Sequence, residues 1–236
     1  MRKSTRRRID SANDLAVWGA DAAGNEVAMD VGSAAPFVPA SRRLQDLRVA
    51  ARSCTACPLY RDTTQTVFGE GADRAALMLV GEQPGDQEDR QGHPFVGPAG
   101  AVLSRCLDEA GIDRSTLYLT NAVKHFKHEQ RGARRLHKKP GTAEVKACHP
   151  WLEAELEAVG GAVVVALGAT AARAVLGRSV GIAASRGRPI DIGGRTAFVT
   201  FHPSAVLRAS DEAEEIRAAL VADLRLAAAG GGSTTR

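Results

Sequence analysis

The sequence predicts a three-layer α/β/α fold, in which helices cover both faces of a central, mainly parallel, four-stranded sheet. Three observations predict it: four short apolar runs, helical periodicity between them, and a polar motif or a glycine directly after each run. Apolar, β-branched runs without alternation are typical of strands that are buried on both faces. Strands that alternate with helices form parallel sheets through right-handed crossovers.

The expected elements alternate along the chain. The four strands are expected at residues 76–80, 115–120, 162–167 and 196–201. Helical patterns are found at residues 99–110, 142–159 and 169–176. Because ligands of such sheets bind beyond the carboxyl ends of the strands, the residues that follow each run are candidates for a functional site.

The length and composition favour one folded domain. The chain has 236 residues, 44% of them hydrophobic, and no apolar run approaches the length of a membrane span. We therefore expect a soluble protein, monomeric by default, with no membrane partner. No secretory signal follows the basic start, which indicates a cytoplasmic location. The domain is expected at residues 41–229, between a poorly ordered basic tail at 1–40 and a flexible end at 230–236.

Basic residues are unevenly distributed, although the formal net charge is only +4. One group lies near the start of the chain, and a second follows the strand expected at 115–120. The second group would attract a polyanion because it lies beside the candidate site, and a solvated basic loop is the alternative. Its members are Lys124, Lys127, Arg131, Arg134, Arg135, Lys138 and Lys139.

The cysteines indicate a metal or cluster site. Cys54 and Cys57 form a C-x-x-C pair, which in a cytosolic chain favours such a site over a disulfide. Cys148, just before a proline, is the obvious third ligand, whereas Cys106 falls on an amphipathic helix and is expected to pack in the core. His125 is a candidate fourth ligand because imidazole can replace thiolate on iron. Zinc held by three cysteines and one histidine fits the same residues.

Five motifs accompany these elements. They are Gly81-Glu82-Gln83-Pro84-Gly85-Asp86-Gln87-Glu88-Asp89, Pro94-Phe95-Val96-Gly97, Thr120-Asn121-Ala122-Val123-Lys124-His125-Phe126-Lys127, Arg134-Arg135-Leu136-His137 and His202-Pro203-Ser204. Together they resemble the uracil-DNA glycosylase superfamily, and the similarity runs from about Cys54 to Leu224. Within the superfamily the chain is similar to the UdgX class, which is related to the family-4 enzymes that contain an iron-sulfur cluster.

The resemblance implies a structural [4Fe-4S] cluster. Its ligands would be Cys54, Cys57, His125 and Cys148, with Cys106 left as a packing residue. Family-4 enzymes carry cysteine where this chain has His125, whereas the UdgX class resembles this chain in having histidine there. The expected substrate is uracil-containing DNA, with single strands preferred.

The predicted chemistry is cleavage of the N-glycosidic bond of deoxyuridine. This reaction places positive charge on the sugar and negative charge on the departing base, which must first leave the stack. By their motif positions, Asn121 would bind the uracil edge, Phe95 would stack on the ring, and His202 would donate to a base oxygen. Each has an alternative role, Phe95 in the core, Asn121 as a cap and His202 in a turn.

His137 distinguishes this chain from an ordinary turnover glycosylase. Once uracil departs, C1′ of the sugar is electron-poor, and a neutral imidazole in contact with it would compete with water. The product would be a covalent protein-DNA adduct, the outcome for which the UdgX class is known. The motif Lys-Arg-Arg-Ile-His of that class reads Ala133-Arg134-Arg135-Leu136-His137 here, so one charge is lost and one apolar residue is exchanged.

Polar and charged neighbours are expected to support His137. Glu82 would orient the imidazole and stabilise its cation, while Arg134 and Arg135 would keep it neutral. By resemblance, Gln83 would position this loop and the base.

Asp86 is the remaining residue of the predicted catalytic group, although acidic residues beside a tight Gly-Pro turn can simply bind backbone amides. Two rival functions stay open: a conventional multiple-turnover uracil-DNA glycosylase, in which His137 only lines the groove, and a noncatalytic, metal-stabilised binder of single-stranded nucleic acid.

Arg208 would hold a phosphate or brace the loop of His137. The residues expected to contact DNA are Arg134, Arg135, Lys138 and Arg208.

Overall fold

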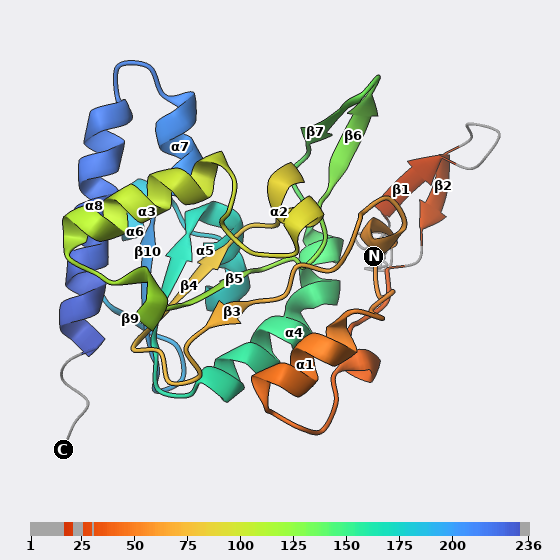
Figure 1. Cartoon of the computed structure of the whole chain (residues 1–236), viewed down its shortest axis with the longest axis horizontal. Helices are drawn as coiled ribbons and strands as arrows, with labels where there is room; N and C mark the ends of the chain where they lie inside the picture. Colours follow the sequence, from red (N-terminus) through yellow and green to blue (C-terminus); the bar gives the residue numbers. More distant parts are fainter. Residues whose placement is uncertain (1–16, 21–25, 30, 232–236) are drawn as a thin grey trace, which may run out of the picture.

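A six-stranded sheet forms the centre of the structure, a computed structural model that describes residues 17–20, 26–29 and 31–231 (Figure 1). The strand order is β3-β5-β4-β8-β10-β9. The inner strands are parallel, as predicted, and they are β5 (Tyr118–Asn121), β4 (Leu77–Gly81), β8 (Val163–Leu167) and β10 (Thr196–Thr200). Two short antiparallel strands extend the edges, β3 (Glu70–Gly71) and β9 (Ile190–Asp191).

The helices begin and end close to the predicted residues. The helix predicted at 142–159 has these bounds, and the two others begin one residue earlier than predicted. In the described part of the chain the α-helices are α1 (Leu44–Ala51), α2 (Asp86–Gln91), α3 (Pro98–Ala110), α4 (Thr142–Val159), α5 (Gly168–Leu176), α6 (Ile182–Ser185), α7 (Pro203–Arg208) and α8 (Ala213–Gly231). The 3-10 turns are η2 (Ala35–Phe37), η3 (Pro58–Arg61) and η4 (Arg114–Thr116).

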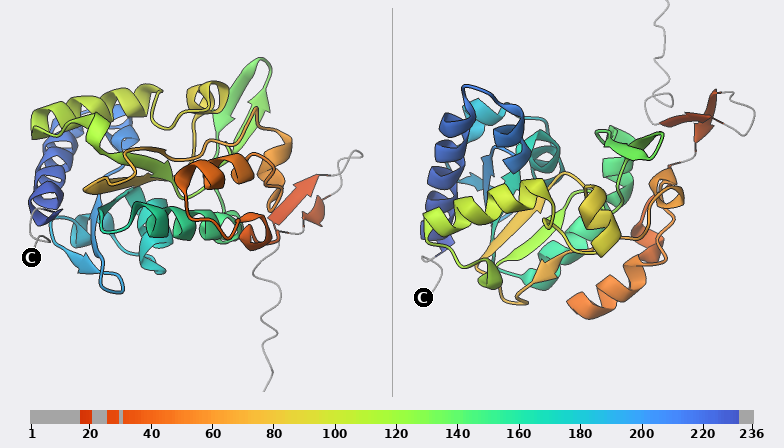
Figure 2. Two further views of the ribbon diagram at one scale, coloured as in Figure 1. Left: turned by 60° about the horizontal axis from the view of Figure 1, so that its bottom comes forward. Right: turned by 45° about the horizontal axis from the view of Figure 1, so that its top comes forward.

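Helices cover both faces of the sheet, which confirms the predicted layers (Figures 1 and 2). Successive side chains of a strand point to opposite faces. In β4, Leu77 and Leu79 pack with α3 and α8, whereas Met78 and Val80 pack with α4 and α5. Every residue of β4 is buried, which explains why its sequence is apolar without alternation.

The strand expected at 115–120 begins later than predicted, at Tyr118. The residues before it form the 3-10 turn η4 because the carboxylate of Asp113 accepts the backbone N–H of Ser115 at 2.8 Å. The other three strands differ from their expected bounds by one residue at one or both ends.

An antiparallel hairpin stands where the sequence indicated a basic loop. Its strands are β6 (His128–Arg131) and β7 (Arg134–His137), and His128 lies opposite His137 at the base. Gly132 makes the turn in a left-handed conformation, with φ at 56°. Figures 1 and 2 show the hairpin projecting away from the sheet.

The expected tail at 1–40 is described in part. Two short strands, β1 (Val17–Ala20) and β2 (Glu26–Met29), pair antiparallel. Ala34 is 0% exposed and donates its N–H to the carbonyl of Ala147 at 2.8 Å, so the packed domain includes residues before 41. The expectation of disorder for residues 1–16, 21–25 and 30 concerns residues outside the described part.

At the other end, α8 continues through Gly231, so the expected flexible end at 230–236 begins within a helix. Residues 232–236 lie outside the described part. Nowhere in residues 17–20, 26–29 or 31–231 does a helix combine the length and apolarity that crossing a membrane requires.

Candidate active site

The carboxyl ends of the four parallel strands bring polar side chains to one edge of the sheet. Glu82 follows β4, Asn121 ends β5, Thr170 lies in the first turn after β8, and His202 follows β10. Three of these were predicted from the sequence. Thr170 was not, because it lies in an alanine-rich helix without a motif, and its place after an apolar run was the only signal.

Three of the four residues predicted to contact uracil, all except Gln83, lie together. A Cβ on Gly81 would be 2.3 Å from Oδ1 of Asn121 and 2.6 Å from Cζ of Phe95, so only glycine leaves room for both side chains. The ring of His202 lies beside that of Phe95, with centroids 6.3 Å apart. Asn121 and Phe95 are buried. Amide, aromatic face and imidazole thus meet at the ends of β4, β5 and β10.

Phe95 has a strained backbone. Its φ of 57° lies in the left-handed region, which costs an ordinary residue about 1–3 kcal/mol. Arg114 holds this conformation, since its Nη2 donates to the Phe95 carbonyl at 3.0 Å. Gly100 of α3 also packs closely against that carbonyl: a Cβ on Gly100 would lie only 2.0 Å from the carbonyl oxygen of Phe95. Such strain is concentrated at functional sites, which favours the base-stacking role over simple packing.

His202 is a neutral ring whose proton is on Nε2. Its Nδ1 accepts the backbone N–H of Ser204 at 3.2 Å and lies 2.7 Å from Ser204 Oγ. A ring nitrogen that accepts a backbone N–H carries no proton, so Nε2 is the donor. Burial, with smaller effects from Arg208 and His137, lowers the pKa of His202 to about 4. At neutral pH the side chain therefore offers one N–H, on Nε2, to an acceptor.

Arg208 braces His202. Its Nη1 donates to Ser204 Oγ at 2.8 Å, which leaves the hydroxyl hydrogen for Nδ1 of His202. The sequence predicted that Arg208 would brace the loop of His137, whereas the hydrogen bond found here braces Ser204 beside His202. Phosphate binding by Arg208 stays a prediction.

Glu82 and His137 face each other. Oε1 of Glu82 lies 3.8 Å from Nε2 of His137, and its Oε2 accepts a short hydrogen bond from the hydroxyl of Thr170. The His137 side chain is 51% exposed, so DNA has access to the imidazole, whereas Glu82 is only 21% exposed.

Burial is the main reason that the pKa of His137 is lowered from its ordinary 6.5. Glu82 raises this pKa, Arg208 lowers it and Glu88 raises it. The ring is therefore kept neutral, as expected, but by burial and Arg208 and not by the two arginines of the predicted motif.

Gln83 joins the two ends of the β6-β7 hairpin at its base. Its Oε1 accepts the N–H of Lys127 at 3.1 Å, and its Nε2 lies 3.1 Å from the Lys127 carbonyl and 3.0 Å from the Lys138 carbonyl. The same Nε2 is 3.0 Å from Nε2 of His137. The two hydrogens of this amide are shared among three acceptors, and because an amide nitrogen only donates, the contact with Nε2 of His137 fits the tautomer whose ring proton is on Nδ1.

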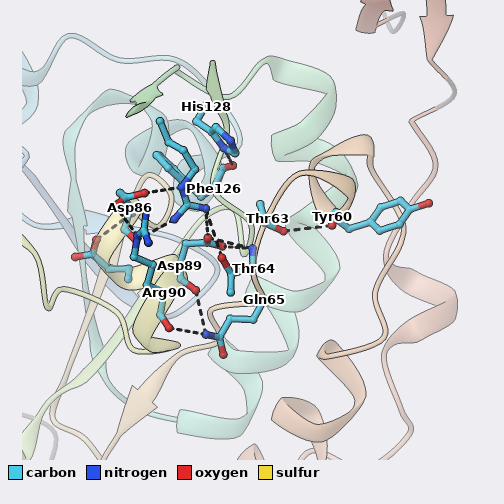
Figure 3. Close-up of polar contacts among 12 residues, drawn as sticks. Tyr60, Thr63, Thr64, Gln65, Asp86, Asp89, Arg90, Phe126 and His128 are labelled. Atoms are coloured by element: carbon cyan, nitrogen blue, oxygen red, sulfur yellow. Dashed lines mark hydrogen bonds and ion pairs between the residues drawn. The ribbon is translucent and has the colours of Figure 1, made fainter. Parts of the chain in front are cut away.

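Arg135 ties the hairpin to α2. Its Nε and Nη1 reach Oδ1 of Asp86 and Oδ2 of Asp89, both at 2.5 Å. Asp89 is fully buried and also accepts the backbone N–H of Thr64 at 3.0 Å, as Figure 3 shows. The guanidinium lies 5.4 Å from the ring centroid of Phe126, which supports it from the hairpin side.

These contacts give Asp86 and Arg135 partners that the sequence did not indicate. Although burial opposes it, hydrogen bonds from Arg90 and Arg135 lower the pKa of Asp86 and keep it ionised. Asp86 thus helps to fix the hairpin, and its predicted catalytic role stays a prediction. Arg135 is 12% exposed and engaged by two carboxylates, whereas Arg134 and Lys138, also predicted to contact DNA, are exposed.

Lys124 is buried, contrary to its predicted place in a basic cluster that faces DNA. It is 1% exposed, and its Nζ reaches Oε2 of Glu155 at 2.5 Å and the carbonyl of Asn121 at 2.7 Å. Glu155 is 0% exposed and accepts hydrogen bonds from Tyr118 and Thr120 as well. A buried ammonium needs such partners, and this one fixes the backbone of Asn121.

Three of the predicted metal ligands are buried, free thiols. Burial raises the pKa of Cys57 to about 11 and that of Cys148 to about 12, so both stay protonated unless a cation shares the site. Two N–H groups donate to sulfur: Nε1 of Trp151 lies 3.3 Å from Sγ of Cys54, and the backbone N of Lys124 lies 3.3 Å from Sγ of Cys148. Such bonds are found around cluster-ligating thiolates.

His125, the fourth predicted ligand, has another contact. Its Nε2 lies 3.0 Å from Oγ1 of Thr66, and burial lowers its pKa to about 4. Among the described residues, no group of three or more His, Cys, Asp or Glu side chains has the arrangement of a metal site. The thiols thus have the chemistry that a cluster needs, and besides burial the nearby Cys57 and Cys54 also raise the pKa of Cys148.

Known proteins resemble this chain over most of its length. A family model of the uracil DNA glycosylase superfamily matches residues 68–225. A type-4 uracil-DNA glycosylase of Thermotoga maritima is 40% identical over 178 residues, which cover 75% of this chain and 88% of that protein. A type-4 enzyme of Pyrobaculum aerophilum is 34% identical over 175 residues, covering 70% and 85%. A type-5 uracil-DNA glycosylase of the same organism is 31% identical over 180 residues, covering 66% and 76%. The family match spans all four parallel strands and the hairpin, and the chain belongs to the uracil-DNA glycosylase superfamily.

Proposed function

We propose that the protein excises uracil from DNA and is then joined to C1′ of the deoxyribose through Nε2 of His137, in a single turnover, as in the UdgX class. The observation that carries the proposal is the setting of this nitrogen. The amide nitrogen of Gln83, which can only donate, lies 3.0 Å from it and favours its unprotonated form, and the Glu82 carboxylate lies 3.8 Å away. An unprotonated imidazole is a nucleophile, and a carboxylate beside it stabilises the cation that alkylation creates.

The excision step uses the three residues at the ends of β4, β5 and β10. Phe95 stacks on the flipped ring, and Asn121 hydrogen-bonds its edge. As the bond between C1′ and N1 of uracil breaks, its electron pair goes to the base. The Nε2–H of His202 then donates to the base oxygen on which negative charge accumulates. Glu82 offers its negative charge to the sugar cation.

The capture step needs no proton transfer. The lone pair on Nε2 of His137 leaves the N–H of Gln83 and forms a bond with C1′. The positive charge moves from the sugar to the imidazolium, whose Nδ1 keeps its hydrogen. Glu82 faces this cation, and the uracil anion takes a proton from water. In the competing reaction water bonds to C1′ and loses a proton, which gives a free abasic site.

The proposed substrate is uracil-containing DNA, with single strands preferred because no partner strand opposes the exit of the base. Lys138 is 51% exposed and pairs with Glu129 at 2.6 Å, so a phosphate can replace this weak surface partner. Arg134 is exposed at the hairpin turn and is the second proposed phosphate contact. We propose that the protein acts as a monomer in the cytoplasm.

We also propose a [4Fe-4S] cluster held by Cys54, Cys57, Cys148 and His125, with zinc as the alternative. The buried thiols and their N–H donors support it. The group would link the residues before β3 to α4 and takes no part in bond cleavage. Protein purified without oxygen should be brown and contain iron and acid-labile sulfide. A colourless preparation with one zinc per chain would show the alternative to be right.

The proposed function is tested by the stoichiometry of uracil release. A labelled single-stranded oligonucleotide with one uracil is incubated with the protein, denatured in SDS and separated on a gel. We expect a slowly migrating band and a halt in uracil release at one equivalent per protein. Free abasic DNA in excess of the protein would instead establish the multiple-turnover rival. Binding without uracil release would establish the noncatalytic binder.

The yield of the adduct should depend on pH through His137. Capture requires the neutral imidazole, and burial lowers the pKa of His137 below its ordinary 6.5. The neutral form therefore persists as the pH falls through 6.5, and capture declines only at more acidic pH. The measurement is the ratio of adduct to free abasic DNA between about pH 8 and pH 4, since this ratio separates capture from excision. A decline centred above 6.5 would contradict the proposed environment of the ring.

A further inference from the structure

Thr170 lies at the carboxyl edge of the sheet, and neither the sequence motifs nor the proposed chemistry gives it a role. It lies in the first turn of α5, directly after β8, and is 6% exposed. Its hydroxyl donates a short hydrogen bond to Oε2 of Glu82. A threonine hydroxyl inside a helix ordinarily bonds to the preceding turn, so a bond to a carboxylate on another element is a specific arrangement.

This hydrogen bond fixes which oxygen of Glu82 faces the nucleophile. Within residues 31–231, Thr170 makes the only hydrogen bond to the Glu82 carboxylate. With Oε2 held by Thr170, Oε1 is the oxygen directed at Nε2 of His137, at 3.8 Å. A carboxylate without this partner would rotate about its side-chain bonds and would share its charge between the ring and water.

We propose that Thr170 is a positioning residue which, by holding Glu82, directs the C1′ cation to His137 and away from water. This inference rests on the proposed function. In the capture reaction the bond from Nε2 to C1′ forms, and the held carboxylate neutralises the resulting imidazolium. In the hydrolytic reaction the bond from water oxygen to C1′ forms, and a released carboxylate accepts the water proton. Loss of the Thr170 hydroxyl therefore weakens the first reaction and assists the second.

Two substitutions distinguish the effect of the Thr170 hydroxyl from the effect of the side chain's shape. Thr170→Val removes the donor and keeps the branched form, whereas Thr170→Ser keeps the donor. A matched control is Thr142→Val, because Thr142 also makes a hydrogen bond between elements, accepting from Nη1 of Arg173 at 2.7 Å, but does not touch Glu82. Thr170→Ala provides a second hydroxyl-free variant if Thr170→Val does not fold, as judged by circular dichroism.

The experiment uses an excess of the full chain over a labelled single-stranded oligonucleotide with one uracil. SDS-stable adduct and free abasic DNA are measured in the same samples. In Thr170→Val we expect the ratio of adduct to abasic DNA to fall about tenfold, the effect of losing one hydrogen bond to a charged group. In Thr170→Ser and Thr142→Val we expect the ratio of the wild type.

A second measurement is the pH dependence of the same ratio. Of the charged groups that affect His137, Glu82 raises its pKa, Arg208 lowers it and Glu88 raises it. Releasing Glu82 removes one raising effect, so the acidic decline of the ratio should move to lower pH in Thr170→Val. A general loss of packing would reduce excision and capture together and would leave both the ratio and its pH dependence unchanged.

The possible outcomes distinguish this inference from the proposed function. If the wild type forms an adduct and Thr170→Val keeps the wild-type ratio, the role of Thr170 is refuted. A lowered ratio in Thr170→Ser or Thr142→Val would also refute it, because neither change removes the bond to Glu82. If the wild type releases uracil and forms no adduct, the proposed capture fails, and with it the inference.

Discussion

Replacing His137 with serine should abolish the SDS-stable adduct while uracil release continues beyond one equivalent per protein. Serine lacks the Nε2 lone pair that Gln83 keeps available, and the vacated space admits water to C1′. Because a positioned nucleophile gains a large effective concentration, we expect the adduct to fall to about one hundredth of its wild-type yield or less. The measurements are the gel shift and the amount of uracil released at limiting protein.

His128→Ser is the matched control for this substitution. His128 lies directly opposite His137 in the hairpin and stacks on Phe126 with centroids 4.9 Å apart, but it does not contact Glu82 or Gln83. Adduct formation should survive this change. An adduct that persists in His137→Ser, or one that disappears equally in both variants, would exclude His137 as the attacking residue.

Replacing Lys124 with methionine should destabilise the whole domain. The substitution leaves the Glu155 carboxylate buried without its cation, which typically costs about 3–5 kcal/mol. For a domain of this size the midpoint of thermal unfolding should fall by roughly 10 °C. Excision should also weaken, because the ammonium of Lys124 no longer holds the carbonyl of Asn121. Circular dichroism during heating and uracil release at low temperature measure the two effects.

Lys146→Met provides the comparison, since Lys146 is exposed on α4 and its loss should change stability by less than about 0.5 kcal/mol. A further check is the double substitution Lys124→Met with Glu155→Leu. Replacing both charges by apolar groups should recover part of the lost stability. If Lys124→Met is as stable as Lys146→Met, the ion pair does not hold this region together.

The predicted sheet depends on local patterns, and this is why the sequence reveals it. Each inner strand is an apolar run buried on both faces, as in Val163–Leu167, and the bounds of α4 follow from its own periodicity. The β6-β7 hairpin was not predicted because its strands are polar and charged and show no buried alternation. Gln83 and Arg135 anchor it, and both anchors act through residues distant in sequence.

The location of the candidate site also followed from the sequence, because parallel strands end at one edge. Several roles did not follow. Lys124 looked like a surface cation, and only the fold brings it to Glu155, while Arg135 meets Asp89 across 46 positions of the chain. The sequence shows that these groups are charged, but it does not show which partner each one meets. Buried ion pairs of this kind are the part of a site that composition and motif spacing leave undetermined.

The hydrogen bonds of Gln83 at the base of the hairpin separate the position of His137 from that of the turn at the far end. Gln83 fastens the chain at Lys127 and Lys138, so residues 128–137 form an arm that is secured where His137 sits. Ala133, the position at which the class motif has lysine, lies at the opposite, free extremity beside Gly132. Under the proposed function, changes in length or charge at that extremity would alter which stretch of nucleic acid the arm touches and would leave Nε2 of His137 in place. Affinity for DNA and formation of the covalent bond can thus change independently among related proteins.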